Sequence, residues 1–256
     1  MSAFQPPTLR QRAAAASDLA REHVLESETL GHLHPKVVET MQDMSLPQLL
    51  KHGSVSTIRE FVDVCGILSE GDMSAGWCNF VWGINNYLVG LYPSATQEKV
   101  WQNPKTLISG SLSPLGNTDT VSSDGALISG RWSFNAGCDY AEWLLLGFSD
   151  SGGDSYLALV HSSEYETEDG SRMLGLRGAG PADAPGSPRP RRGVEGGLSR
   201  RRLVDRVTGS GAAAEDARGV LTLPELRQSL GLPRGEREVV APRPLAGDLV
   251  HVVRAR

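Results

Sequence analysis

Helical periodicity organises the first hundred residues of this 256-residue chain. A stretch rich in Ala, Arg and Glu at 8–27 is typical of a surface helix. Pro35 favours the first position of a short helix that runs to about Met44. Thr57 and Glu60 have the spacing of a capping box, and the apolar residues of a third helix follow them. The sequence therefore predicts a series of helices in its N-terminal part.

The next predicted helix begins after Asp72, whose side chain can cap it. Its large apolar residues recur at helical spacing and predict one core-facing side: Trp77, Phe80, Val81, Ile84 and Leu88. The opposite side carries Asn79, Asn85 and Asn86 among apolar neighbours, so we expect this helix to be buried nearly all round. Ser94-x-x-Gln97 predicts the cap of one more short helix, ending near Trp101.

After Pro104 the pattern changes to that of β-strands. The segments 106–114, 119–134, 142–148, 155–162 and 165–169 have strand character, and Asp124-Gly125 is a hairpin-turn signal. Helices followed by strands indicate an α+β fold. We expect an N-terminal all-helical domain at 8–103 and a β-barrel-like middle domain at 104–178.

Composition and charge argue against several classes of protein. The net charge of −5 argues against a protein that binds nucleic acid or an acidic membrane. No run of 18 apolar residues could span a membrane, and residues 1–12 lack the apolar core of a signal peptide. Cys65, Cys78 and Cys138 form no CxxC pair, so we interpret them as reduced packing residues of a cytoplasmic protein.

The segment 179–256 differs in composition from what precedes it. All 15 aromatic residues of the chain lie at or before Tyr165, and the segment is rich in Gly, Ala, Pro and Arg. A packed domain of this length without aromatic residues is unusual, because aromatic side chains dominate core burial. Three interpretations are open: a disordered segment, a small and poorly packed domain, or the out-of-frame translation of a GC-rich gene.

Two strand regions carry small polar residues where a flat ligand could approach the backbone. One is 108–119, with Gly110, Ser111 and Ser113; the other is 134–139, where Asn135-Ala136-Gly137 interrupts a strand. Small side chains permit close approach to a backbone, and N–H groups at strand ends can bind heteroatoms. From the pattern alone, turns at a sheet edge are favoured over a ligand site.

The sequence predicts no metal site. His32 and His34 are two residues apart, which suits a strand more than a helix face, and no third ligand is close to them in sequence. We therefore interpret these histidines as turn residues. The chain also lacks a dinucleotide-binding, P-loop or nucleophile-elbow motif.

Residues 15–178 resemble the helical and middle β domains of the acyl-CoA dehydrogenase fold. The closest resemblance is to the flavin-dependent aromatic monooxygenases that serve as oxygenase components of two-component systems. Four stretches carry it, in the family's order and spacing: GDMSAGWCNFVWGINNYLVGLYP, EKVWQNPKTLISGSLSPLGNTDTV, GALISGRWSFNAGCDYAEWLLLG and MLGLRGAG. The family continues with a C-terminal four-helix bundle. That bundle is not recognisable in 179–256, which favours the out-of-frame interpretation of this segment.

The resemblance implies a bound flavin, FMN or FAD. It places along the isoalloxazine ring the strand residues Gly110, Ser111, Leu112 and Ser113, then Thr118, and from the interrupted strand Phe134, Asn135 and Ala136. Asn85 stands where the monooxygenases usually present a histidine, which makes it the candidate catalytic residue. Asparagine can orient a substrate but cannot take up a proton near neutral pH. Ala136 stands where relatives commonly have serine.

The activity that the resemblance implies is hydroxylation of an aromatic or polyketide-like substrate by reduced flavin and O2. A separate flavin reductase would be the partner, and the family is typically homotetrameric. Two alternatives remain: an acyl-CoA dehydrogenase that uses FAD to oxidise a CH–CH bond, and an inactive truncated remnant.

Overall fold

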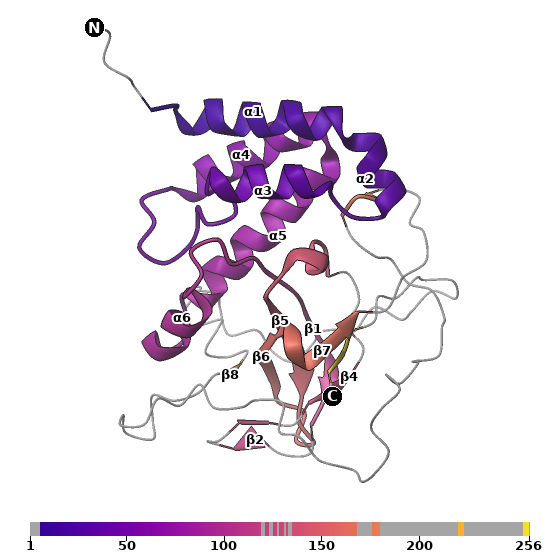
Figure 1. Ribbon diagram of the computed structural model, residues 1–256. Helices are drawn as coiled ribbons and strands as arrows, with labels where there is room; N and C mark the ends of the chain where they lie inside the picture. The colour runs from indigo at the N-terminus through magenta and orange to yellow at the C-terminus, as the bar shows by residue number, and fades with distance from the viewer. Residues whose placement is uncertain are drawn as a thin grey trace, which may run out of the picture.

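The computed structural model describes residues 6–118, 121–122, 125–126, 128–130, 132, 135–167, 176–179, 220–222 and 253–255. Helices occupy the first hundred residues and strands follow, which confirms the α+β class. Figure 1 shows the helices gathered on one side of the molecule and the strands on the other, with one long helix leading from the first group to the second.

The helices begin and end close to the positions that the sequence signals indicate. They are α1 (Leu9–Glu22), α2 (Val24–Leu30), α3 (Pro35–Asp43), α4 (Ile58–Gly71), α5 (Met73–Val89) and α6 (Ser94–Val100). Thr57 and Glu60 form the expected capping box, and Asp72 caps α5 by accepting from the Ser74 N–H at 2.8 Å. The expected single helix at 8–27 is divided at His23, which ends α1 and precedes α2.

The cap predicted for α6 is wrong. Pro93, not Ser94, is the N-cap residue, and no side chain caps the helix. Gln97 instead donates through Nε2 to the carbonyl oxygens of Gly90 and Tyr92, at 3.0 and 2.7 Å. These bonds hold the turn between α5 and α6, so the polar side chain at the expected capping position secures the preceding turn.

The face predicted as the core side of α5 is also wrong in part. Trp77 and Phe80 are 46% and 37% exposed, whereas Asn79, Asn85 and Asn86 are buried. The helix contacts α4 and β1. Asn79 lies against Cys65 of α4, and Asn86 bonds to Pro47 and Trp101. The helix is therefore not buried all round. The exposed aromatic pair stacks, with ring centroids 5.5 Å apart.

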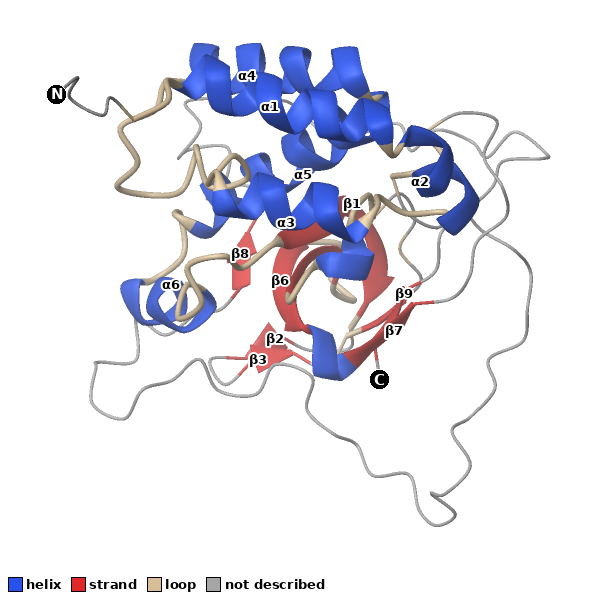
Figure 2. Ribbon diagram, turned by 45° about the horizontal axis from the view of Figure 1, so that its top comes forward, coloured by secondary structure: helices blue, strands red, loops and turns tan. Residues whose placement is uncertain are grey.

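The main sheet contains five strands in the order β4-β1-β5-β6-β8. Their bounds are β1 (Ile108–Asn117), β4 (Ser129–Gly130), β5 (Trp143–Ser149), β6 (Ser155–His161) and β8 (Val220–Thr222). The β1–β5 pair is parallel and the other pairs are antiparallel. Strand β5 is buried along nearly all its length, which explains its continuous apolar run. Figure 2 shows these strands as a strongly curved sheet below the helices.

Four shorter strands form two small ladders outside the main sheet: β2 (Val121–Ser122) with β3 (Gly125–Ala126), and β7 (Tyr165–Thr167) with β9 (Val253–Ala255). Ser122 pairs with Gly125, so Gly125 belongs to strand β3 and not to the turn predicted at Asp124-Gly125. Ala179, β8 and β9 are described within 179–256; the other residues of that segment, and with them its expected character, lie outside the described residues. Among the helices that the structure describes, none is long and apolar enough to cross a membrane.

Candidate functional site

Strand β1 carries a bulge at the segment that the resemblance places along a flavin. Ser111 pairs with Leu146 and Gly116 with Phe148, so the four residues 112–115 lie opposite a single residue of β5, Gly147. A bulge of this kind takes backbone groups out of the ladder and bends the strand. Leu112 and Leu115 are 42% and 45% exposed. The bulge therefore presents an exposed apolar surface, with backbone groups that are free of the ladder.

Gly147 fixes the position of this bulge. A Cβ at residue 147 would lie 2.5 Å from the carbonyl oxygens of both Leu112 and Ser113, a distance that no side chain tolerates. The Gly147 carbonyl oxygen also accepts a hydrogen bond from the Trp132 indole at 2.5 Å. The bulge thus packs on a backbone that only glycine can provide.

The predicted residues of β1 occupy different environments. Leu112 and Ser113 are exposed, and Gly110 and Ser111 are half-buried. A Cβ on Gly110 would lie 2.0 Å from the Leu145 carbonyl oxygen, so this glycine is needed for the approach of β5. Thr118 is buried at the end of the strand, where its N–H donates to the Ser149 carbonyl oxygen at 3.0 Å. The exposed part of the predicted flavin strand is therefore its middle.

The interrupted strand at 135–139 connects the β domain to α5. Asn135 and Ala136 are 0% and 7% exposed, so the chain itself covers both side chains. The Ala136 carbonyl oxygen accepts from the Ser109 hydroxyl at 2.7 Å, and the Gly137 N–H donates to the Ala179 carbonyl oxygen at 2.8 Å. The interruption thus has a packing role within the chain. Phe134 lies outside the described residues.

Asn135 retains one unused hydrogen-bonding atom. Its Nδ2 donates to the Trp132 carbonyl oxygen at 2.7 Å, but its buried Oδ1 has no hydrogen-bond donor among the described residues. A buried acceptor without a donor costs about 1–3 kcal/mol. The side chain is fully buried, so this acceptor is not open to a ligand from solvent.

The candidate catalytic residue, Asn85, is 3% exposed on α5. Its neighbour Asn86 has a role that sequence reasoning missed. Asn86 Nδ2 donates to the carbonyl oxygens of Pro47 and Trp82, and Oδ1 accepts from the Trp101 indole at 3.0 Å. This residue ties α5 to α6 and to the loop after α3. The signal was the run of asparagines on an otherwise apolar helix.

Tyr140 and the Cys78 and Cys138 thiols, which lie near the interruption, stay protonated at neutral pH. Burial raises the pKa of Tyr140 to about 12 and raises the pKa values of the Cys78 and Cys138 thiols. All three cysteines are free. The predicted site residues that the structure describes are Gly, Ser, Leu, Thr, Asn and Ala, which exchange no proton near pH 7. This surface can bind and orient a ligand.

Comparisons with known proteins identify homologues of the chain. The oxygenase subunit HsaA of a flavin-dependent monooxygenase from Mycobacterium tuberculosis is 32% identical over 187 residues, which cover 68% of this chain and 43% of the relative. The crystal structure of 3-HSA hydroxylase from Rhodococcus sp. RHA1 matches with a TM-score of 0.63 at 27% identity, over 67% of this chain and 46% of that one. The chain is homologous to the oxygenase components of flavin-dependent monooxygenases.

A second relative supports the same homology. The oxygenase component of the FADH2-dependent resorcinol hydroxylase from a Rhizobium species is 27% identical over 177 residues, covering 65% of this chain and 43% of that protein. No family model matches the chain. The chain spans less than half the length of these relatives.

Proposed function

We propose that the chain forms one side of a flavin site in an oxygenase that hydroxylates an aromatic or polyketide-like small molecule. The observation that carries this proposal is the β1 bulge, because two of its exposed residues, Leu112 and Ser113, are among those that the resemblance places along the ring. The homologues are named as flavin-dependent monooxygenases, which supports the same cofactor class, FMN or FAD.

The residues present fit a flavin. Leu112 and Leu115 offer an apolar surface of the kind that a flat aromatic ring covers. Ser111 and Ser113 carry hydroxyl groups on the same stretch of strand, next to backbone groups outside the ladder. Asn135 Oδ1 has no donor within the described part of the chain, but the side chain is fully buried and is not part of this exposed surface. Together the residues of β1 supply apolar contact and hydrogen bonds, the two needs of an isoalloxazine ring.

When bound, reduced flavin supplies the electrons that activate O2. The tasks of this chain are then binding, orientation and exclusion of water from the β1 side. Asn85 has an amide that can hold a substrate oxygen in place, but it cannot remove the proton of a phenol. The proposal includes a separate reductase as the source of reduced flavin, as the names of oxygenase components imply.

Flavin binding tests the site directly. The full chain is mixed anaerobically with photoreduced FMN or FAD, and the retained flavin is measured after ultrafiltration. We expect Leu112→Asp to weaken retention at least about tenfold, because it places a charge on the apolar surface. Leu25→Asp is the matched control, since Leu25 is 75% exposed on α2. Retention of neither flavin by the natural chain, or equal retention by both variants, would overturn the proposed site.

A second measurement tests the reaction. Reduced flavin, O2 and a panel of substituted phenols are added to the chain, and hydroxylated products are identified by mass spectrometry. Product that depends on the chain and is lost in Leu112→Asp supports the oxygenase. Flavin retention without any product leaves the binding site standing and removes the hydroxylase assignment.

A further inference from the structure

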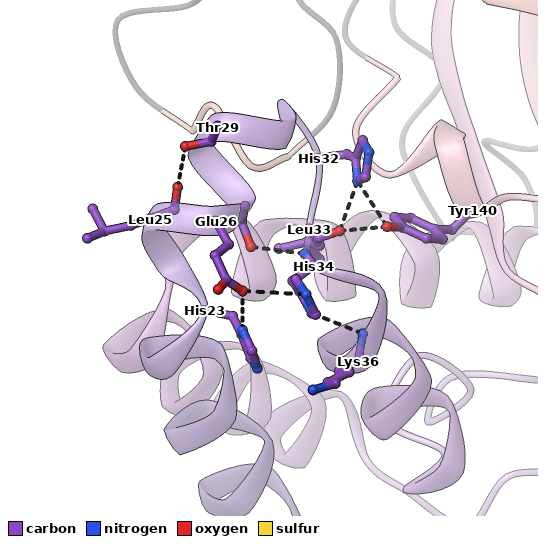
Figure 3. Close-up of polar contacts among 10 residues, drawn as sticks. His23, Leu25, Glu26, Thr29, His32, Leu33, His34, Lys36 and Tyr140 are labelled. Carbon is purple, nitrogen blue, oxygen red and sulfur yellow. Dashed lines mark hydrogen bonds and ion pairs between the residues drawn. The ribbon is translucent and has the colours of Figure 1, made fainter.

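Two histidines and a glutamate meet where the first three helices join. His23 follows the last residue of α1, Glu26 lies in the first turn of α2, and His34 is the N-cap residue of α3. Figure 3 shows the three side chains pointing toward one another. The sequence hides this cluster, because the loop between α2 and α3 must fold back before His34 can reach the other two residues.

The distances within the cluster are short. Glu26 Oε2 lies 2.5 Å from His23 Nδ1 and 3.4 Å from His34 Nε2. One ligand atom from each of the three residues can be chosen so that all lie within 4.8 Å of one another. The two imidazole rings stack, with centroids 4.1 Å apart and planes inclined by 6°. The histidine side chains are 17% and 21% exposed and that of Glu26 is 60% exposed, so the imidazoles are shielded and the carboxylate is open to solvent.

We propose that His23, Glu26 and His34 form a site for a divalent cation of the zinc class. Two imidazoles and one carboxylate are a donor set that Zn²⁺ uses in sites with three protein ligands, where water or another group completes the coordination. In a tetrahedral zinc site, ligand atoms lie about 3.3 Å from one another. The Glu26–His34 separation already has this value, and the His23–Glu26 pair needs to open by less than about 1 Å. One imidazole must also rotate, because a bound cation lies in the plane of each ring and the two rings are stacked nearly parallel.

The hydrogen bonds of His34 show which proton must move before its ring can bind a cation. Its Nδ1 accepts from the Lys36 backbone N–H at 3.3 Å, so in the neutral ring the proton is on Nε2, which faces Glu26. A cation on Nε2 takes the place of that proton, which moves to Nδ1, so that the ring binds as a neutral imidazole. The bond to Lys36 is long, so its loss opposes binding only weakly.

The charges around the cluster permit binding. Glu26 is a carboxylate at neutral pH and is therefore available as a ligand. Lys36 is a positive charge that faces Glu26 and opposes a dication, but it is exposed, so solvent screens it. His32, in the same loop, points the other way and contacts Tyr140 and the Leu33 carbonyl oxygen.

A cation at this position would connect the end of α1, the start of α2 and the start of α3. The expected consequence is a more stable joint between these helices, because the ion binds the folded arrangement and not the unfolded chain. The inference does not rest on the proposed flavin site, since none of its three residues belongs to β1 or α5.

Zinc titration of the full, tag-free chain tests the proposal. We expect one Zn²⁺ per chain, bound at least about tenfold more weakly by His34→Asn and by Glu26→Gln. Asparagine is itself a favoured N-cap residue, so His34→Asn removes the ligand and keeps the cap of α3. His32→Asn is the matched control and is expected to bind as the natural chain does. Co²⁺ spectra then distinguish nitrogen and oxygen ligands from cysteine sulfur.

Chemical modification of the natural chain tests the zinc site without any variant, in case a variant does not fold. Diethyl pyrocarbonate modifies accessible histidines, and mass spectrometry locates the modified residues. Zn²⁺ is expected to protect His23 and His34 and to leave His32 and His52 unchanged. The absence of stoichiometric binding, undiminished binding in His34→Asn, or protection of neither cluster histidine would each overturn the site and leave only an ion-paired cluster.

Discussion

Trp82 and Gly137 join the helical domain to the β domain through one hydrogen bond and one close contact. The Trp82 indole Nε1 donates to the Gly137 carbonyl oxygen at 3.2 Å. Gly137 has a φ of +71°, and a Cβ there would lie 2.5 Å from the same indole nitrogen. Both the backbone conformation and the space therefore require glycine, and the interrupted strand is small for this reason irrespective of any ligand.

Gly137→Ala is expected to destabilise the protein by about 2–4 kcal/mol, because a left-handed backbone and an overpacked contact add together. Urea unfolding followed by tryptophan fluorescence measures this change. Gly153→Ala separates the two terms: Gly153 has a φ of +86° but no atom within 4 Å of its Cβ position. It should cost about 1 kcal/mol from the backbone alone. Equal costs for the two variants would show that the Trp82 contact does not matter.

Asn86→Leu is expected to cost about 2–4 kcal/mol, because it leaves the Pro47 carbonyl oxygen and the Trp101 indole without partners. Asn79→Leu is the matched control on the same helix. Asn79 Oδ1 has no partner in the described part of the chain and its Nδ2 contacts only the Cys65 sulfur, so little is lost. We expect a change below about 1 kcal/mol for this control in the same urea experiment.

Helix α5 shows which parts of the fold the sequence could predict. Its start was predictable, because Asp72 caps Ser74 through a local bond that depends on nearby residues alone. Its buried face was not. The helix is apolar on most sides, so its periodicity does not indicate which side faces the core. The prediction rested on the large side chains of Trp77 and Phe80, which are exposed, whereas Asn86 is buried. Which side of such a helix is covered depends on contacts distant in sequence.

The candidate site was predictable in outline for a similar reason. The small residues Gly110, Ser111 and Ser113 are visible in the sequence. The bulge that exposes Leu112, however, depends on Gly147, which lies more than thirty residues later. Pattern alone could not separate ligand contact from packing at Gly110, where the approach of Leu145 accounts for the glycine. Whether Asn135 and Ala136 contact a flavin stays a prediction.

The turn between β5 and β6 has a pH-dependent contribution to stability. Asp150 accepts hydrogen bonds from the Tyr156 hydroxyl at 2.9 Å and from the Gly152 and Asp154 N–H groups. The bond from Tyr156 is the main cause of a folded-state pKa below the ordinary 3.8. The unfolded state therefore binds the proton more readily, so the contribution is complete above pH 3.8 and is lost as pH falls through the folded pKa.

Asp150→Asn tests this sign. The natural chain should exceed the variant in free energy of unfolding by a constant amount at neutral pH, and the difference should shrink as pH falls below 3.8. Denaturant titrations between about pH 2 and pH 7 measure it. Asp154→Asn removes the same charge from an exposed position in the same turn and should keep the natural pH profile. A difference that grows in acid would contradict the assignment.

Gly147→Ala is expected to displace the β1 bulge and weaken flavin retention about tenfold or more, because its Cβ would collide with the carbonyl oxygens of Leu112 and Ser113. Anaerobic ultrafiltration with reduced FMN or FAD measures the effect.

The control is a variant that destabilises the protein at a position away from β1. Gly71→Ala is such a variant, because its Cβ would lie 2.0 Å from the Ser17 carbonyl oxygen, between α1 and α4. Circular dichroism confirms that both variants are folded at the assay temperature. If Gly71→Ala loses flavin to the same degree as Gly147→Ala, the loss reflects general destabilisation, and the bulge has no specific part in binding.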